Sequence, residues 1–434
     1  MMSKGYVVTV FSSVQWLIFI FANTVVVPIS IGTVFEVPQD TIGMMLRCSL
    51  ILTGVACMFQ GWIGHRMPIM EGHSGLLWGV ILNLGLTASS MGMSLSTIGG
   101  GITTGILLAC VFTIVLAACN GLSLFQSIFS PMVMSVYLFL LTFQLIFIFF
   151  KGMFPLTKDG VLDVPLSLLS IGIVILVVII KLKGSKSISN FSILIGLMIG
   201  WILHDLFFMD VSQRALEASS MSFTLFPIGE PNLEFGIIGV TFFAVVINLS
   251  NTIASIDAAG KLINKETPQH RFRNSIYVTS VFTAIGTGFG LVPYTPFTSS
   301  IGFLQSTRIF HSKPFLIGGG LLTTIGLVPI FGSFLATMPI SVGNAVLFVA
   351  YLQLFGTAFS SLNGKTFNSN TIFRLAAPVL VGISIMNISP TVFADIPLYI
   401  QPFISNGLII GVLLSVTLEK IVNWKVFETV ELNR

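Results

Sequence analysis

The 434-residue chain is 54% hydrophobic and only 8% charged, and its formal net charge is +4. Soluble domains carry roughly 25% charged residues, so a soluble fold of this size could not cover its surface. The composition therefore excludes a soluble protein and predicts an all-α polytopic membrane protein whose solvent is the lipid bilayer. The small net charge gives no indication of nucleic-acid binding. The four cysteines match no zinc or disulfide spacing.

Runs of about 20 apolar residues span the hydrocarbon core of a bilayer. With charges and Pro/Gly clusters taken as boundaries, the sequence contains fourteen such runs. We expect membrane segments at 7–32, 43–62, 68–90, 98–119, 131–151, 163–182, 189–209, 236–256, 274–292, 293–310, 314–335, 342–360, 371–389 and 399–420.

Lys and Arg residues are distributed unevenly between the two sides of this arrangement. With the N-terminus in the cytoplasm, sixteen of them fall inside and four fall outside, at Arg47, Lys151, Lys158 and Arg214. An excess of positive residues marks cytoplasmic loops. The bias predicts a multi-pass protein of the cell (plasma or inner) membrane with both termini in the cytoplasm. It also supports fourteen crossings, because a missed segment would invert the pattern downstream.

The third and tenth segments begin with stretches that do not favour a continuous helix. Residues 67–75 contain a proline, two glycines, a glutamate and a histidine, and residues 292–302 contain two prolines and several hydroxyls. Proline removes a backbone donor and disfavours helix in the preceding residue, so we expect extended backbone there. Interruptions at matching positions of two seven-segment halves indicate 7+7 inverted repeats with a binding site at the midplane. The alternative is that both stretches only kink ordinary helices.

Polar side chains inside membrane segments are costly and are functional candidates by default. Four segments carry them: Gln15, Asn23 and Thr24; Glu71, His73 and Ser74; Asn248, Ser250, Asn251, Thr252, Ser255 and Asp257; Thr295, Thr298, Ser299 and Ser300. Amides and hydroxyls predominate, and their directional hydrogen bonds suit a neutral planar solute better than an anion. The alternative role of such groups is to join helices. Aromatic residues that could stack on a planar solute, or simply pack, are Phe19, Phe21, Trp78, Phe243 and Phe297.

The carboxylates Glu71 and Asp257 fall in or at the end of membrane segments that carry the other polar candidates. Burial favours the neutral form of a carboxyl group, so both are candidates for proton coupling, together with His73. Each also has a structural interpretation, because Glu71 follows Arg66 closely and Asp257 lies near Lys261. The sequence contains no Walker motif, HExxH or GxSxG. We therefore expect no enzyme activity and no metal or cofactor, and transport that is passive or driven by an ion gradient.

Four stretches resemble motifs of the uracil/xanthine permease family, the nucleobase–cation symporters that include the nucleobase–ascorbate transporters. Residues 15–28 resemble its Gln-His pair followed by Phe and Pro, and residues 71–75 resemble its Gln-Gly-x-Ser-Phe. Residues 250–260 resemble its Glu-Thr-Ile-Gly-Asp stretch, and residues 293–302 resemble its Pro-x-Thr-Thr-(Tyr/Phe)-x-(Glu/Gln)-Asn-x-Gly motif. No motif is specific alone, but the four occur in the family's order along the chain.

The resemblance implies a core domain (residues 1–125 and 230–338) and a gate domain (residues 126–215 and 339–434). It implies short antiparallel β-strands interrupting segments 3 and 10, with a nucleobase bound between them and the eighth segment, and a homodimer through the gate domain. The substrate-binding residues that we expect are Gln15, Asn23, Gly72, His73, Ser74, Gly75, Asn251, Ser255, Thr298, Ser299 and Ser300.

Every charged position of the family's site is neutral in this sequence. The base-binding carboxylate corresponds to Asn251, the proton-linked His or Asp to Ser255, and the Glu/Gln of the tenth segment to Ser299. The Phe of the third segment corresponds to Gly75, which together with Ser299 would enlarge the pocket for a bulkier base. Since Asn251 cannot titrate, proton coupling would move to Glu71, Asp257 or His73.

We therefore expect a secondary transporter that imports a purine or pyrimidine nucleobase, such as uracil or xanthine. We expect proton symport with an elevator-type or rocking alternating-access mechanism. Two alternatives stay open: a Na⁺-coupled or uncoupled nucleobase carrier, and an anion transporter of sulfate-permease-like fold. An anion site would favour a positive residue or a helix N-terminus, and no Lys or Arg falls in the middle of a segment. A channel, or an enzyme using the isolated Glu-x-His at Glu71 and His73, is a weaker alternative.

Overall fold

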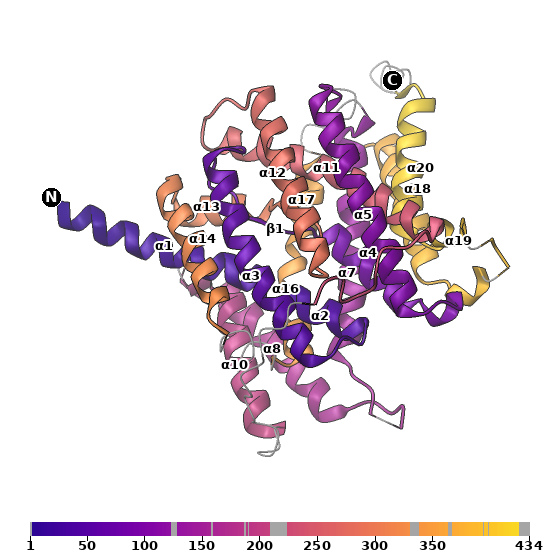
Figure 1. Ribbon diagram of the computed structural model, residues 1–434, viewed down its shortest axis with the longest axis horizontal. Coiled ribbons are helices and arrows are strands. Elements are labelled where there is room, and N and C mark those ends of the chain that lie inside the picture. The colour runs from indigo at the N-terminus through magenta and orange to yellow at the C-terminus, as the bar shows by residue number, and fades with distance from the viewer. Residues whose placement is uncertain are drawn as a thin grey trace.

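The computed structural model describes residues 2–122, 128–157, 159–185, 188–189, 191–208, 224–329, 338–362, 367–393, 395–397 and 399–424. Helices form most of this part of the chain, and a two-stranded sheet lies in the middle of the bundle (Figure 1). Each of the fourteen expected segments contains helical structure, although residues 190 and 209 of the seventh and 330–335 of the eleventh lie outside the described residues.

Helices follow one another closely along both halves of the chain. The first half contains α1 (Met2–Thr24), α2 (Val26–Val34), α3 (Gln39–Trp62), α4 (Gly75–Leu86), η1 (Ser89–Met91), α5 (Leu95–Ala118), α7 (Pro131–Met153), α8 (Val164–Lys183) and α10 (Ser192–Phe208). The second half contains α11 (Phe235–Leu262), α12 (Gln269–Gly288), α13 (Ser299–Thr307), α14 (Ser312–Leu327), α16 (Ile340–Tyr351), α17 (Gln353–Ser360), α18 (Ser369–Met386), η3 (Pro390–Phe393), α19 (Gln401–Ile404) and α20 (Gly407–Ile421).

By length and composition, 8 helical stretches within the described residues could cross a membrane. They are Thr9–Val34, Gln39–Trp62, Leu95–Ala118, Pro131–Met153, Val164–Lys183, Phe235–Leu262, Ile340–Ser360 and Ser369–Met386. Two shorter apolar helices, α4 and α10, lie between them in sequence. Both halves of the chain therefore contain apolar helices, as expected of a polytopic membrane protein.

Short polar side chains determine where several of these helices begin. Ser94, Ser130 and Asp163 each accept a hydrogen bond from the backbone N–H three residues ahead, which is the N-cap arrangement. Pro131 follows Ser130 at the first position of α7, where its missing N–H costs nothing. Ser74 caps α4 in the same way, so this helix begins in the interior of the bundle.

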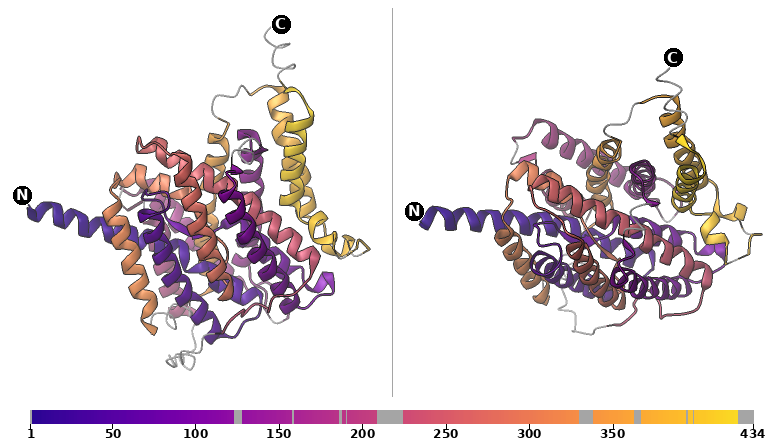
Figure 2. Two further views of the ribbon diagram at one scale, coloured as in Figure 1. Left: turned by 45° about the horizontal axis from the view of Figure 1, so that its top comes forward. Right: turned by 90° about the horizontal axis from the view of Figure 1, so that it is seen from above.

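The helices pack in two groups. In the first, α14 packs against α3 and α1, α5 packs against α11 and α12, and α3 contacts α12. In the second, α7 packs against α16, α17, α18 and α20, and α8 packs against α10 and α16. Helices α18 and α20 lie side by side at the end of the molecule opposite the N-terminus (Figure 2). Contacts of α4 with α7 and of α2 with α16 connect the groups.

Two strands from distant parts of the chain form the sheet. Strand β1 (Glu71–His73) pairs antiparallel with β2 (Tyr294–Pro296), and Gly72 lies opposite Thr295. Two further backbone hydrogen bonds extend the pairing, from the N–H of residue 74 to the carbonyl of residue 293 at 2.7 Å and from residue 297 to residue 70 at 2.8 Å. These strands confirm the interruptions expected in the third and tenth segments. They are short because proline supplies no N–H to a ladder.

Candidate functional site

The two strands present their side chains to opposite faces of the sheet. Alternation along a strand directs Thr295 to one face and Glu71 and Tyr294 to the other. On the first face, Thr295 Oγ1 accepts a hydrogen bond from Asn251 Nδ2 of α11 at 3.2 Å. On the second face, the Tyr294 hydroxyl lies 3.2 Å from Thr53 Oγ1 of α3. The sheet therefore separates a face directed at α11 from a face packed on α3.

A cavity of about 1340 Å³ lies on the α11 side of the sheet. Its wall includes residues of α1 and α11 from the first helix group and of α7, α16 and α17 from the second. Seven of the predicted substrate-binding and proton-coupling residues line it: Asn23, Ser74, Gly75, Asn251, Asp257, Thr298 and Ser299. Ligand pockets usually measure about 300–1,000 Å³. This one is larger because it continues to exposed side chains such as Lys261.

Amide and hydroxyl groups at the inner end of this cavity are hydrogen-bonded to one another. Asn251 donates to Thr295, and its Oδ1 accepts from Thr298 Oγ1 at 3.2 Å. The Ser255 hydroxyl lies 2.7 Å from the Thr298 hydroxyl, and a hydrogen bond between them helps to fix the position of Thr298. A primary amide offers two N–H groups and two carbonyl lone pairs. Asn251 therefore keeps one donor and one acceptor beyond these two bonds for a bound molecule.

The helices that follow the two strands both begin at the cavity. Ser74 and Ser299, at the starts of α4 and α13, are on its lining. Helix N-termini carry unsatisfied N–H groups and a partial positive charge. Ser74 Oγ also donates to Asn248 Oδ1 at 2.8 Å, which connects the start of α4 to α11. The polarity of this site thus comes from dipoles rather than from full charges.

Several predicted residues are not on the lining of the large cavity. Ser300 is buried, and its Oγ accepts from the N–H of Met70 at 3.0 Å, so it stabilises the start of β1. Ser255 is not on the lining either, but its hydroxyl lies within hydrogen-bond distance of Thr298, which is. The remaining predicted residues that are not on the lining of the large cavity are Gln15, Gly72, His73 and Glu71.

The imidazole of His73 is buried between the sheet and α3. Its Nε2 lies 2.6 Å from Ser49 Oγ, and its Nδ1 lies 2.9 Å from the carbonyl oxygen of Val292. A carbonyl oxygen only accepts, so Nδ1 carries the proton and Nε2 of the neutral ring accepts from Ser49. Both nitrogens are therefore committed to structural hydrogen bonds, and the ring fastens β1 to α3.

The carboxyl group of Glu71 is fully buried on the same face of the sheet. Its Oε1 accepts from Thr279 Oγ1 of α12 at 2.6 Å. Its backbone N–H and carbonyl both contact Cys57 Sγ of α3 at 3.3 Å. Oε2 has no hydrogen-bond partner among the described residues. Glu71 is therefore a buried acidic group behind the sheet, separated from the cavity by the strands.

Asp257 occupies the opposite, open end of the cavity. Its Oδ2 lies 2.6 Å from Lys261 Nζ, one helical turn further along α11. The two side chains are 46% and 76% exposed. Such an exposed pair contributes little to stability, about 0.3–0.5 kcal/mol. Asp257 belongs to the mouth of the cavity, and it is not beside the amide and hydroxyl groups at the inner end.

Tyr351, at the end of α16, is a lining residue that the sequence did not indicate. A Cβ atom placed on Gly75 would lie 3.4 Å from both the ring and the hydroxyl oxygen of Tyr351. Tyr351 therefore lies beside Gly75 on the cavity wall, and the expectation that Gly75 and Ser299 enlarge the pocket for a bulkier base stays a prediction. No local signal in the sequence relates these two positions, because they meet only when the two helix groups pack.

Two of the predicted aromatic residues, Phe19 and Phe297, line the cavity. Phe243 is 40% exposed and lies elsewhere on α11. Trp78 is buried, and its Nε1–H donates to Ser30 Oγ at 2.8 Å. Among the described residues, no three His, Cys, Asp or Glu side chains form a group that could hold a metal ion.

Three curated relatives align with nearly the whole chain. Bacillus subtilis (strain 168) YwdJ, which is provisionally named a purine permease, is 27% identical over 429 residues, with 96% of each protein covered. The xanthine permease of the same organism is 22% identical over 434 residues and covers 97% of this chain and 95% of its own. The uric acid transporter UacT of Escherichia coli (strain K12) is 21% identical over 426 residues, with 94% and 85% covered.

Two solved structures share the fold. The transmembrane domain of the cyanobacterium bicarbonate transporter BicA matches with a TM-score of 0.63 and 12% identity, covering 94% of this chain and 96% of that one. SLC26A9 matches with a TM-score of 0.61 and 12% identity, covering 94% and 65%. A family model described as "Permease family" (Xan_ur_permease) matches residues 8–391. The chain therefore belongs to this permease family and is a multi-pass membrane permease, not an enzyme.

Proposed function

We propose that the protein is a secondary transporter that imports a purine or pyrimidine nucleobase. The observation that carries this proposal is the convergence of uncharged polar groups from Ser74, Asn251 and Thr298 at the inner end of a large cavity. The relatives' names, which include purine, xanthine and uric acid, support this substrate class.

The chemistry of the cavity suits the edge and the faces of a nucleobase. Such a base presents N–H and C=O groups side by side along its edge, which is complementary to the remaining donor and acceptor of Asn251. Phe19 and Phe297 offer apolar ring surfaces on the same lining, and stacking on aromatic side chains accommodates any base. The site thus combines directional polar recognition with a flat apolar contact.

We further propose that import is driven by proton symport. The inner end of the cavity is neutral at Asn251, Ser255 and Ser299, so coupling falls to an acidic group elsewhere. Glu71 is the better candidate, because its buried carboxyl group gains or loses a proton with a large change in electrostatic energy. Asp257 is exposed and paired with Lys261, so gain or loss of its proton changes the electrostatic energy less. Na⁺ coupling and uncoupled transport are the alternatives, and no cofactor is proposed.

The proposed topology has fourteen crossings in two inverted halves, in the plasma or inner membrane, with cytoplasmic termini. The core domain comprises residues 1–125 and 230–338, and the gate domain comprises residues 126–215 and 339–434. The cavity lies between the two helix groups, so an elevator-type or rocking movement of one against the other would alternate its access. The positive residues at its mouth, Lys181 and Lys261, are cytoplasmic in this topology, so the proposal makes this an inward-open state. A homodimer through the gate domain completes the proposal.

Transport by the purified full-length protein in proteoliposomes tests this function. We expect at least one of radiolabelled uracil, xanthine, hypoxanthine, guanine, adenine and uric acid to accumulate when the outside is made acidic. A protonophore should abolish the accumulation, and replacing Na⁺ by K⁺ should not. Failure of all six bases to accumulate or exchange would contradict the nucleobase proposal. Uptake of bicarbonate or sulfate in their place would support the anion alternative.

A further inference from the structure

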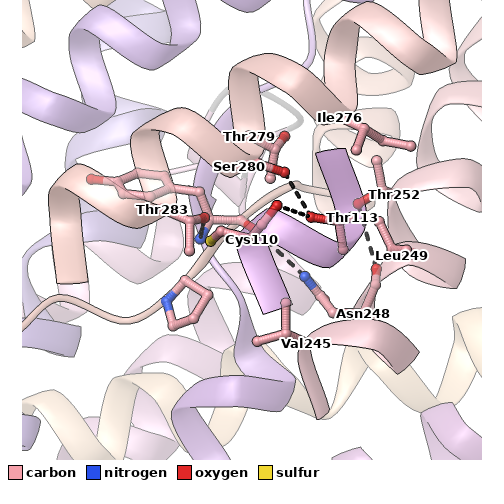
Figure 3. A pocket seen from close by; sticks show the side chains of 12 residues that line it. Cys110, Thr113, Val245, Asn248, Leu249, Thr252, Ile276, Thr279, Ser280 and Thr283 are labelled. Carbon is pink, nitrogen blue, oxygen red and sulfur yellow. Dashed lines mark hydrogen bonds between the residues drawn. The ribbon is translucent and has the colours of Figure 1, made fainter. Parts of the chain in front are cut away.

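A second, much smaller cavity lies between α5, α11 and α12. Its volume is about 20 Å³, and its polar lining includes Thr113, Asn248, Thr252, Thr279 and Ser280. Figure 3 shows α12 supplying Thr279 and Ser280 on one side and α11 supplying Asn248 and Thr252 on the other. A buried water needs a volume of about 10–15 Å³ and two to four polar partners. This cavity meets both requirements for a single water molecule.

Thr279 connects the small cavity to Glu71. Its Oγ1 accepts a hydrogen bond from Gln60 Nε2 at 2.9 Å and donates to Glu71 Oε1 at 2.6 Å. A hydroxyl group has two lone pairs and one proton, so one lone pair remains after these two bonds. Because Thr279 is on the lining of the small cavity, a water molecule there can donate to this lone pair. The direction water to Thr279 to Glu71 is the one required to protonate the carboxylate.

Thr252 connects the small cavity to the large one. Its Oγ1 lies 3.3 Å from Oγ1 of Thr295, the middle residue of β2. Thr252 lines the small cavity, and Thr295 lines the large one beside Asn251. Hydroxyl groups thus reach from the substrate cavity to the small cavity, and from there to the acid behind the sheet.

The groups that surround the Glu71 carboxyl group are suited to an acid that takes up and releases a proton. The titratable groups near it are Cys57 on α3, His73 on its own strand and Tyr294 on β2, and α12 contributes the neutral Thr279. Within the described residues, no Lys or Arg forms an ion pair with Glu71. A buried carboxylate without a countercharge is costly, so a change in the charge of Glu71 changes the electrostatic energy strongly, and the proton needs a path to reach or leave it.

We propose that a water molecule in the small cavity relays protons between the substrate cavity and Glu71 through Thr252 and Thr279. This inference rests on the proposed proton symport. For each proton taken up, Thr279 accepts one from the water and passes its own to Glu71 Oε1, and the carboxylate becomes a neutral acid. The water is restored by a proton that arrives through Thr252 from the substrate cavity. Release follows the same steps in reverse, and only protons move.

The first test is Thr279→Val, which removes the hydroxyl at nearly constant volume. In proteoliposomes containing the full-length protein, we expect pH-driven accumulation of the best transported base to fall at least tenfold. Exchange of labelled for unlabelled base, which requires no net proton movement, should stay within about twofold of wild type. Thr279→Ser should restore accumulation. Unchanged accumulation in Thr279→Val would overturn the relay.

Thr287→Val is the matched control on the same helix. Thr287 is buried, its hydroxyl donates to the carbonyl of Thr283 at 2.7 Å, and it lines neither cavity. We expect this variant to accumulate substrate as wild type does. Equal losses in Thr279→Val and Thr287→Val would show a general effect on the helix and overturn the relay.

A second variant, Cys110→Leu, tests the water itself. Cys110 lines the small cavity from α5, and a larger side chain there would displace the water without removing any of the hydroxyl groups. We expect loss of pH-driven accumulation and of base-dependent acidification of the vesicle lumen, measured with a trapped pH dye, while exchange continues. If wild type transports no base, the proposed function itself fails. If wild type is proton-coupled and Thr279→Val and Cys110→Leu are both still proton-coupled, the relay is wrong while the proposed transport function stands.

Discussion

Thr298 Oγ1 donates a hydrogen bond to Asn251 Oδ1 at 3.2 Å, and this bond connects the start of the second interrupted helix to the middle of α11. It also determines which way the amide faces, because Asn251 Nδ2 must then point to Thr295 Oγ1. Helix α11 and the start of α13, which both line the cavity, are therefore held together before substrate arrives. Binding to such a preorganised site loses less entropy than binding that must order its own groups.

Replacing Asn251 by Ala should weaken nucleobase binding. The variant loses the donor and acceptor that face the substrate and also releases Thr298 and Thr295. We expect the Kd or KM to rise about 10- to 100-fold, because each 1.4 kcal/mol lost corresponds to a factor of ten. Competition for uptake of a labelled base measures the change. Asn387→Ala, at an exposed amide that donates to the carbonyl of Ile383 on its own helix, is the control, and an affinity within twofold of wild type for Asn251→Ala would contradict the assignment.

The contact between Gly75 and Tyr351 predicts a compensating pair of substitutions. A Cβ atom at position 75 would already be in van der Waals contact with the Tyr351 ring at 3.4 Å, so the larger ring of a Phe there would compete with Tyr351 for the same space. We expect Gly75→Phe to abolish uptake and Gly75→Phe with Tyr351→Ala to restore a substantial part of it. The initial rate of base uptake at matched protein levels measures both. If the double variant is no better than Gly75→Phe alone, the two side chains do not share this space.

The positions of the two strands could be predicted from the sequence because their signal is local. Prolines, glycines and hydroxyls at two matching positions disfavour helix there, and β1 and β2 confirmed this expectation. The polar residues that follow, Ser74 and Thr298, also line the cavity. Backbone chemistry thus determines where the chain is interrupted, whatever packs around it.

The direction of each strand side chain could not be predicted in the same way. Glu71 and His73 belong to an interrupted segment that lines the cavity, yet both point to the face packed on α3 and α12. A shift of one residue in register would reverse this, and the register depends on pairing with a strand from the other half of the chain. Tyr351 was missed for a related reason, because its partner Gly75 is distant in sequence.

Asp257 and Glu71 should differ sharply when each is replaced by its amide. Asp257 forms an exposed pair with Lys261, so Asp257→Asn should leave pH-driven accumulation within about twofold of wild type. Glu71→Gln should abolish it, because an amide fixes the neutral state of a buried acid. Accumulation ratios at a fixed pH gradient, compared with exchange rates in the same vesicles, distinguish the two. Loss of coupling in Asp257→Asn with retention in Glu71→Gln would reverse the assignment.

The buried ion pair between Arg374 and Glu419 predicts a large effect on stability. Arg374 Nε and Nη2 donate to the two carboxylate oxygens of Glu419 at 2.8 and 2.7 Å, and the side chains are only 8% and 11% exposed. The pair joins α18 to α20, and the ring of Trp424 lies 5.0 Å from the guanidinium carbon. Removing one partner leaves an uncompensated buried charge, which costs about 3–5 kcal/mol.

Arg374→Met should therefore lower the thermal unfolding temperature in detergent markedly, and Arg374→Met with Glu419→Leu should recover most of the loss. The recovery is expected because two well-packed apolar side chains of similar volume can replace a buried pair at little net cost. Lys261→Met, which breaks the exposed pair with Asp257, is the control and should shift the unfolding temperature very little. If the double variant is as unstable as Arg374→Met, the contribution of Arg374 comes from its packing against Trp424 rather than from its charge.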